Sequence, residues 1–234
     1  MPVFLPPGCD IHFPPPAAAS PEGLLAVGGD LSVPRLLAAY RQGVFPWYND
    51  DTPILWWNLP ERSILVPEEL HIPHSLRRTI NARRFQISLD WAFADVITAC
   101  AGTRRPGQQG SWIVPAMREA YTALHEAGYA HSVEAWEGGQ LVGGAYGVAL
   151  GRAFFGESMF FKKPDASKTA FVWLVRYLAA QGYALIDCQQ VTEHTSRFGA
   201  VSIDRDSFMC SLKNALVGDD RAGRWQLPDD FFPL

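Results

Sequence analysis

The sequence predicts an α+β protein in which a small, irregular N-terminal domain packs on a larger C-terminal domain of β-β-β-α-β order. Proline, glycine and tryptophan crowd the first 60 residues, where a single helix is clear. From residue 131 three strand-like stretches follow one another, and an amphipathic helix and an apolar strand come next. We expect a domain boundary near residue 60, which divides the chain into 1–60 and 61–234.

The first half of the chain carries separate helix and strand signals. Ser32 is a suitable N-cap, Pro34 fits a first helical turn, and Gly43 stops the helix. For the rest of the first domain the sequence predicts turns and short extended segments. A second helix is expected to begin after Pro73, QISLDWAF predicts a strand or a short edge piece, and residues 113–127 predict an amphipathic helix.

From residue 131 the spacing of the apolar residues changes from helical to strand-like. HSVEAW, QLVGGAYGVAL and RAFFGESMFF read as an antiparallel meander, because EGG and LGR form the turns between them. SKTAFVWLVRYLAAQG then predicts a helix and YALIDCQ an apolar strand. A strand–helix–strand unit implies a parallel pair. A last helix is expected near 205–217.

Composition excludes several classes of protein. The chain has 234 residues, is 48% hydrophobic and carries a net charge of −4, so its surface as a whole is not a nucleic-acid-binding field. Its apolar runs fall below the ~20 residues of a membrane span. MPVFLPPGCD is no signal peptide, and the 4 cysteines form no C-x-x-C pair, so we expect a cytoplasmic protein without a metal, a cofactor or a membrane partner.

Two carboxylates and an amide stand beside large apolar residues in the C-terminal half. Glu157 lies in GESMFF, and Asp187 and Gln189 end the run LIDCQ. Alternation along a strand puts Asp187 and Gln189 on one face, at the carboxyl end where open α/β sheets place their sites. A buried charge is costly unless it is paired, so the three residues predict a small polar site. The alternative is that Asp187 and Gln189 brace the segment beginning at Thr192.

An arginine cluster and two loop tryptophans suggest nucleic-acid binding. Between residues 71 and 105 the Lys and Arg positions are all arginine, namely Arg77, Arg78, Arg83, Arg84, Arg104 and Arg105. Arg77 and Arg84 are seven residues apart and are expected to share a helix face. Arginine suits two-pronged phosphate contacts, although a solvated face explains the cluster equally well. Trp47 and Trp112 stand among turn-forming residues, where they would stack on bases or pack against the small domain.

Three other patterns have ordinary explanations. Cys188 with His194 resembles a thiol nucleophile and its base, but an inert buried cysteine is the better interpretation. His71 and His74 flank Pro73 and lack a third metal ligand. The glycines between residues 138 and 151 lie in turns and on a strand rather than before a helix, so they form no phosphate-binding loop.

Several long strings resemble the bacterial leucyl/phenylalanyl-tRNA–protein transferases. They are GLLAVGGDLSVPRLLAAYRQGVFPW, ILWWNLPER, GSWIVPAMREAYTALHEAGYAHSVEAW, LVGGAYGVALGRAFFGESMF, ASKTA and LIDCQ, and the match runs from about Phe13 to beyond Phe208. The resemblance implies an N-acetyltransferase-like C-terminal domain. It also implies transfer of Leu or Phe, and Met weakly, from aminoacyl-tRNA to the N-terminal α-amine of proteins that begin with Arg or Lys. The product of that reaction is an N-degron.

The resemblance also assigns roles to residues of the matching motifs. It implies that Asp187 orients or polarises Gln189 at the attacking amine, and that Glu157 orients the amine or the ribose hydroxyls. Trp47 and Trp112 match tryptophans that contact the tRNA 3′ end. The pocket for the Leu or Phe side chain is expected to be lined by Ala145, Phe154, Met159, Phe171, Leu174 and Ile186. Ala145 stands where the family has a methionine and Leu174 where it has an aromatic residue, and both differences bear on the size of this pocket.

The arginines complete the expected contacts with the tRNA. We expect Arg77, Arg78, Arg83 and Arg84 to bind phosphates of the acceptor stem, which carry no base identity. Two other classes of protein remain open. A coenzyme A-dependent N-acetyltransferase would need a glycine-rich pyrophosphate loop, which KKPDASKTA lacks, and a non-catalytic RNA-binding module would not need the Glu157, Asp187 and Gln189 cluster.

Overall fold

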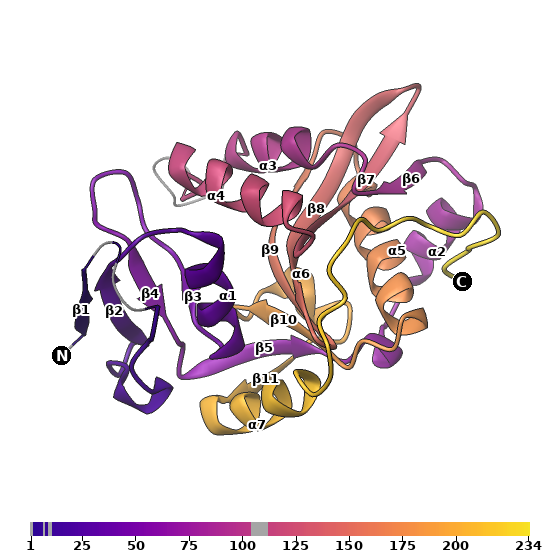
Figure 1. Ribbon diagram of the computed structural model, residues 1–234. Helices are drawn as coiled ribbons and strands as arrows, with labels where there is room; N and C mark the ends of the chain where they lie inside the picture. Colours follow the sequence, from indigo (N-terminus) through magenta and orange to yellow (C-terminus); the bar gives the residue numbers. More distant parts are fainter. Residues whose placement is uncertain (1, 7, 9–10, 104–111) are drawn as a thin grey trace.

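The computed structural model describes residues 2–6, 8, 11–103 and 112–234, and its described strands form two sheets (Figure 1). The smaller sheet has the strand order β1 (Val3–Leu5), β2 (Leu24–Gly28), β4 (Leu55–Trp57) and β3 (Phe45–Pro46). Helix α1 (Val33–Arg41) packs beside it, and a short 3-10 turn covers Pro16–Ala18. The predicted helix after Ser32 is confirmed, and the short extended pieces are in fact paired strands.

The larger sheet has seven described strands and carries the C-terminal half of the chain. Its order is β11 (Val201–Asp204), β5 (Glu61–Leu65), β10 (Leu185–Gln189), β9 (Ala153–Phe161), β8 (Gln140–Leu150), β7 (Ala130–Glu137) and β6 (Gln86–Leu89). The antiparallel meander β7-β8-β9 is confirmed, and so is the parallel pairing of β9 with β10. The predicted β-β-β-α-β order is therefore present.

Helices cover both sides of the larger sheet. Figure 1 shows α3 (Phe93–Ala101) and α4 (Pro115–Glu126) on one side, with α2 (His74–Asn81) and α5 (Ala166–Ala180) on the other. Two apolar cores follow from this arrangement, one between the sheet and α1, α3 and α4, and the other beneath α2 and α5. The remaining elements are the 3-10 turn Pro67–Glu69, α6 (Glu193–Ser196) and α7 (Arg205–Ala215).

Two local predictions differ from the structure. Helix α2 ends at Asn81, and Arg83 adopts a left-handed φ of 46°, so Arg77 and Arg84 do not share a helix face. The chain leaves the helix there because it must reach the extended strand β6. Helix α3 was not predicted, although Phe93, Val96 and Cys100 lie on its buried face at helical spacing.

Strands β9 and β10 diverge near the middle of the larger sheet. Their pairing covers Ala153–Phe155 with Leu185–Asp187, whereas β9 continues along β8 to Phe161. The register between β10 and β5 shifts at Asp187, and Gln189 takes a left-handed φ of 59°. This divergence opens the sheet toward the smaller sheet and α1. None of the described helices is long and apolar enough to cross a membrane.

Candidate active site

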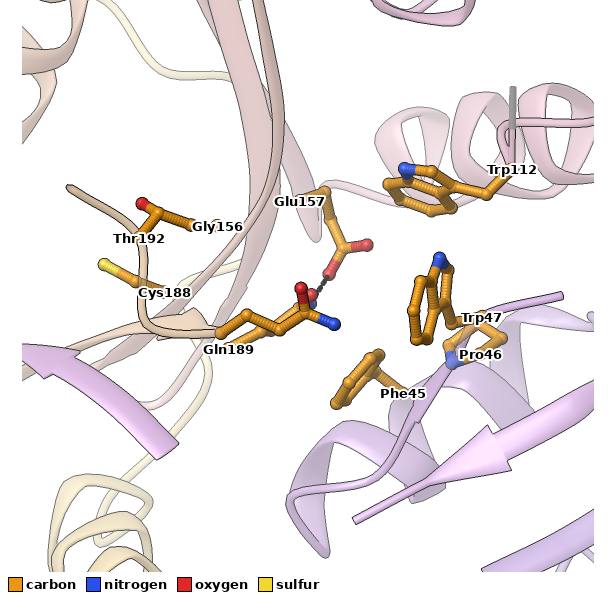
Figure 2. Close-up of a pocket in the computed structure, with 10 residues that line it drawn as sticks. Phe45, Pro46, Trp47, Trp112, Gly156, Glu157, Cys188, Gln189 and Thr192 are labelled. Carbon is orange, nitrogen blue, oxygen red and sulfur yellow. Dashed lines mark hydrogen bonds between the residues drawn. The ribbon is translucent and has the colours of Figure 1, made fainter. Parts of the chain in front are cut away.

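A cavity of about 150 Å³ lies where β9 and β10 diverge, facing the N-terminal part of the chain. Figure 2 shows the indole rings of Trp47 and Trp112 on one side of it and Glu157 and Gln189 on the other. Its walls are formed by Phe45, Pro46, Trp47, Trp112, Gly156, Glu157, Cys188, Gln189, Gln190 and Thr192. Two of the three predicted polar residues and both predicted tryptophans thus meet in one place.

Glu157 is a buried carboxylate with three hydrogen-bonding neighbours. Tyr40 Oη lies 2.8 Å from its Oε1, Tyr121 Oη lies 3.2 Å from its Oε2, and Gln189 Nε2 donates to Oε1 over 2.8 Å. Burial raises the pKa of the Glu157 carboxyl to about 7, although the hydrogen bonds from Tyr40 and Tyr121 act in the opposite direction. Such a group exchanges a proton near neutral pH.

The two tyrosines give independent support for a protonated Glu157. Their hydroxyls also hydrogen-bond to each other, so Tyr40, Tyr121 and Glu157 form a triangle of contacts. Two hydroxyls supply two protons, and the third contact is satisfied only when Glu157 carries one as well. Burial, and next the charge of Glu157, raise the pKa of both tyrosines well above the usual value, so their own protons stay in place.

Both tyrosines lie on helices that the sequence predicts, but neither was predicted to belong to the site. Tyr40 lies on α1 and Tyr121 on α4, and each occupies a position at helical spacing that faces the core. Their hydroxyls meet although the residues are 81 positions apart in the chain. A tyrosine at a core position of an amphipathic helix is the signal that could have predicted a buried polar partner.

Gln189 is held at the cavity by its backbone. Its N–H donates to Asp187 Oδ1 over 2.8 Å, which supports the left-handed conformation at φ 59°. For a residue with a side chain this conformation costs about 1–2 kcal/mol. The bend directs the Gln189 side chain at Glu157, so the strain serves the placement of the amide.

Asp187 is fully buried and lies outside the walls of the cavity. Its carboxylate accepts from Arg62 twice, at 3.0 Å from Nε to Oδ1 and 2.5 Å from Nη2 to Oδ2. Asp187 was predicted to orient or polarise the Gln189 side chain. Its carboxylate instead accepts a hydrogen bond from the Gln189 backbone N–H. The sequence analysis did not identify Arg62. An arginine at the start of the apolar strand sequence ERSILV is the feature that could have indicated a buried charge with an acidic partner.

The two predicted tryptophans take different environments. Trp112 is nearly buried, with 8% of its surface exposed, just before α4. Trp47 is partly exposed after β3, and its ring lies 5.9 Å from that of Trp57, whose indole N–H donates to the Trp47 carbonyl. Both rings are therefore braced by the fold while they face the same cavity (Figure 2).

The predicted side-chain pocket lies on the other side of the sheet from the Glu157 carboxylate. Its members all belong to or pack against the core beneath α5, and they are Ala145, Phe154, Met159, Phe171, Leu174 and Ile186. Gly156 and Cys188 line the cavity beside this core, at the gap between β9 and β10. The structure brings the six residues together, and they contribute nothing to the walls of the described cavity.

The predicted phosphate-binding arginines are exposed, and none of the four that the structure describes lines the cavity. Arg77, Arg78, Arg83 and Arg84 lie on α2 and in the segment that follows it, on the α5 side of the sheet. Arg84 forms an ion pair with Glu137 at 3.0 Å, and Arg83 lies over the ring of Phe232. Arg104 and Arg105, also part of the predicted cluster, fall outside the described residues.

Cys188 lines the cavity but is a poor nucleophile. Burial raises the pKa of its thiol to about 12, and the charge of Asp187 adds to this effect. At neutral pH the thiolate is therefore scarce. This agrees with the interpretation of Cys188 as an inert buried cysteine.

Comparisons with known proteins identify the family. The family model for leucyl/phenylalanyl-tRNA protein transferase matches residues 64–213, and the model for the N-terminal domain of that family matches residues 29–59. The chain belongs to this family. A leucyl/phenylalanyl-tRNA–protein transferase of Nitratidesulfovibrio vulgaris (strain DP4) is 55% identical over 233 residues, covering 100% of both chains. Another, from Oleidesulfovibrio alaskensis, is 58% identical over 229 residues, covering 96% of this chain and 92% of the relative.

Family membership decides between the classes that the sequence left open. The protein is an aminoacyltransferase, as predicted, rather than a coenzyme A-dependent acetyltransferase or a non-catalytic RNA-binding module. A solved structure of the C-terminal domain of a putative lysylphosphatidylglycerol synthetase from Agrobacterium fabrum is similar at a TM-score of 0.42 and 13% identity, covering 80% of this chain and 63% of that one.

Proposed function

We propose that this enzyme moves Leu or Phe, and Met weakly, from the 3′ end of aminoacyl-tRNA to the N-terminal α-amine of proteins that begin with Arg or Lys. The product would be an N-degron of the N-end rule pathway in the cytoplasm. One observation carries the proposal beyond family membership. A carboxyl group with a pKa of about 7 and an amide lie together in a cavity that two tryptophans flank.

The donor would enter from the side of the tryptophans. Trp47 and Trp112 present rings on which the 3′-terminal bases of a tRNA can stack, and such stacking tolerates any base. The aminoacyl side chain would pass the gap at Gly156 and Cys188 into the apolar core beneath α5, where Ala145, Phe154, Met159, Phe171, Leu174 and Ile186 gather. An apolar pocket accepts Leu and Phe and rejects charged groups, and because its discrimination among apolar side chains is limited, Met remains a poor but real donor.

The chemistry needs neither ATP nor a metal, because the aminoacyl ester is already activated. The neutral α-amine attacks the ester carbonyl, the C–N bond forms, and the bond from the carbonyl carbon to the ribose oxygen breaks. A proton leaves the amine, and a proton is needed by the departing ribose oxygen. A free α-amine titrates near pH ~8, so a carboxylate with a pKa of about 7 is well matched to receive its proton.

Each polar residue then has a distinct task in this proposal. Glu157 accepts the amine proton, which completes its triangle with Tyr40 and Tyr121, and then returns this proton to the departing ribose oxygen. Gln189 holds Glu157 from the other side and presents its carbonyl oxygen to the amine. Asp187 contributes without touching the substrate, because it is fully buried and fixes the Gln189 backbone.

Other parts of the molecule would serve substrate recognition. The Arg or Lys of the acceptor would face the polar wall that Gln190 and Thr192 contribute. We further propose that the guanidinium groups of Arg77, Arg78, Arg83 and Arg84 contact acceptor-stem phosphates, since all four side chains are exposed. The division into domains at residue 60 is supported by the change of sheet between β4 and β5, and the β-β-β-α-β order supports an N-acetyltransferase-like C-terminal domain.

A donor competition tests the function. Purified protein is mixed with a peptide that begins with Arg and with Leu-tRNA, Phe-tRNA, Met-tRNA or acetyl-coenzyme A, and the product is read by mass. We expect a Leu or Phe residue on the α-amine, little Met and no acetyl group. An N-acetylated copy of the peptide is the matched control and should stay unmodified. Equal transfer to a peptide that begins with Ala would refute the acceptor specificity.

A further inference from the structure

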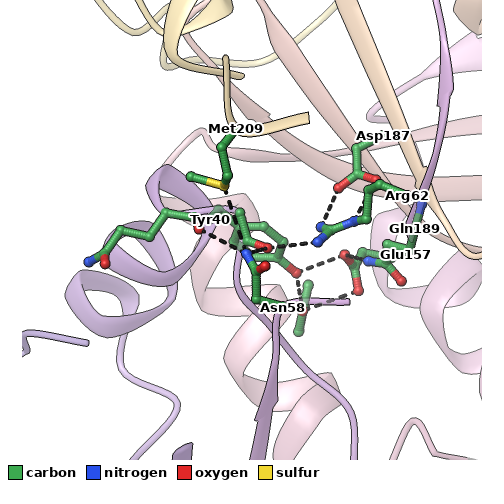
Figure 3. Close-up of polar contacts among 10 residues, drawn as sticks. Tyr40, Asn58, Arg62, Glu157, Asp187, Gln189 and Met209 are labelled. Carbon is green, nitrogen blue, oxygen red and sulfur yellow. Dashed lines mark hydrogen bonds and ion pairs between the residues drawn. The ribbon is translucent and has the colours of Figure 1, made fainter. Parts of the chain in front are cut away.

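A buried arginine connects the two walls of the cavity (Figure 3). Arg62 lies on β5 with 1% of its surface exposed, and all three nitrogens of its guanidinium donate hydrogen bonds. Nη1 donates to the Gly43 carbonyl at 2.8 Å, while Nε and Nη2 hold the carboxylate of Asp187. The rings of Phe45 and Phe208 flank the guanidinium at 4.9 and 4.3 Å.

At one end, Arg62 contacts the side of the cavity where the aminoacyl-tRNA is proposed to enter. Gly43 follows α1 and leads directly into Phe45 and Trp47, which line the cavity. Asn58 also donates to the Gly43 carbonyl, over 3.1 Å. The position of the Trp47 segment therefore depends on what holds Gly43.

The other end is the Gln189 turn. Asp187 Oδ1 accepts from both Arg62 and the Gln189 backbone N–H, and Gln189 Nε2 in turn donates to Glu157. Asp187 has no exposed surface and does not line the cavity. Its charge is matched by Arg62, so neither residue is placed to meet a substrate.

We propose that Arg62 is a positioning residue of the transfer reaction. With Asp187 it forms one unit that fixes the Gln189–Glu157 pair relative to the Trp47 segment. Asp187 takes no proton in this account, and its charge serves to hold Arg62 and, through it, Gly43. The inference rests on the proposed function and adds to it the means by which donor binding and chemistry are aligned.

Removing one charge of a buried pair is far more damaging than removing both, because a lone buried charge remains. This asymmetry gives the test. The variants are Arg62→Gln, Asp187→Asn and the double variant, in which the two amides form a neutral hydrogen bond. Arg35→Gln is the matched control, since Arg35 is another buried arginine, paired with Asp30 in the N-terminal part.

Single-turnover transfer of Leu to an Arg-starting peptide is measured at saturating Leu-tRNA, after thermal unfolding has confirmed that each variant is folded. Each single variant should lose ~10²-fold in rate, as expected for misplacement of the reacting groups. The double variant should regain at least about tenfold over the slower single variant. Below pH 7 the logarithm of its rate should still rise with a slope of about two, from Glu157 and the amine, which a proton-transfer role for Asp187 would reduce to about one.

Measuring the affinity for Leu-tRNA distinguishes the contact of Arg62 with Gly43 from the contact of Asp187 with Gln189. Arg62→Gln should weaken binding roughly two- to tenfold, because the contact to Gly43 is lost. Asp187→Asn should weaken binding less than Arg62→Gln does, because Arg62 loses its carboxylate partner but keeps its own hydrogen bond to Gly43. Arg35→Gln should transfer at the wild-type rate.

Several results would overturn the inference. A double variant as slow as Asp187→Asn alone would mean that the carboxylate itself is required. If the single variants do not fold, Arg62→Lys keeps the charge but loses the two-pronged contact, and a wild-type rate in that variant would overturn the positioning role. Failure of the wild-type protein to transfer Leu would instead refute the proposed function, so the two failures are distinguishable.

Discussion

The substitution Glu157→Gln should make the protein more stable above neutral pH while it abolishes efficient transfer. Burial raises the pKa of Glu157 from the usual 4.5 to about 7 in the folded protein. The folded state therefore binds this proton more tightly than the unfolded state does, and the stability it contributes is fully present below pH 4.5 and lost as pH rises through 7. With 1.36 kcal/mol for each pKa unit, the loss is on the order of 3 kcal/mol.

Glutamine is a close match for the protonated acid at this position. Its Oε1 can accept from Tyr40 and Gln189, and its amide can donate to Tyr121, whose hydroxyl then donates to Tyr40. All contacts of the triangle stay satisfied without a titrating group. The free energy of unfolding of the variant should thus lack the fall between pH 4.5 and 7 that Glu157 causes in the wild type.

The assay compares the two proteins at each pH. Urea unfolding from pH 4.5 to 8.5 gives the difference in stability, which isolates Glu157 from all other carboxylates. Single-turnover transfer of Leu over the same range gives the activity. Below pH 7 the logarithm of the wild-type rate should rise with a slope of about two, because Glu157 and the amine must both be deprotonated, and the variant should retain a slope of about one with a rate ~10²–10⁴-fold lower.

Glu134→Gln is the matched control. Glu134 is another buried carboxyl whose pKa is raised by burial, but it is held by Ser88 on β6 and Ser132 on β7 and does not line the cavity. Its substitution should change the pH dependence of stability and leave the transfer slope at about two. A Glu157→Gln variant whose stability follows the wild-type curve, or whose transfer keeps the wild-type slope, would refute the reasoning.

Three further predictions concern the substrates. Trp112→Ala should weaken Leu-tRNA binding by about 1–3 kcal/mol through lost stacking, measured by filter binding, whereas Trp91→Ala, at a site with 80% of its surface exposed, should leave the affinity unchanged. Ala145→Met should fill the core beneath α5 and lower the transfer of Phe relative to Leu, and an unchanged ratio would remove Ala145 from the pocket. Replacing Arg77 and Arg84 with Ala should make the plot of the logarithm of the tRNA binding constant against the logarithm of salt concentration less steep, by roughly 0.7–0.9 for each lost phosphate contact. A slope identical to that of the wild type would contradict both assignments.

Much of the C-terminal fold could be predicted because its signals are local. The alternation in QLVGGAYGVAL and RAFFGESMFF, with glycine turns between them, specifies β8 and β9 without any distant information. The helix Ala166–Ala180 and the apolar strand after it follow in the same way. The polar cluster was also visible, because charged residues rarely interrupt such apolar stretches.

The connections within the site could not be predicted, because they join distant parts of the chain. Arg62 and Asp187 are 125 positions apart, and nothing local in either strand indicates that they pair. Strand alternation placed Asp187 and Gln189 on one face, but the left-handed bend at Gln189 decides that only Gln189 reaches the cavity. Tertiary packing, rather than pattern, thus separates the residue that meets the substrate from the residue that holds it.

The most direct test of the account is a double-mutant cycle on Glu157 and Gln189. Single-turnover transfer from Leu-tRNA to an Arg-starting peptide is measured for Glu157→Gln, Gln189→Ala and the double variant, with tRNA affinity measured separately. If the two residues act as one unit on the attacking amine, the double variant should be no more than about threefold slower than the slower single variant, at unchanged tRNA affinity. Losses that multiply, or a parallel loss of tRNA affinity, would contradict the account.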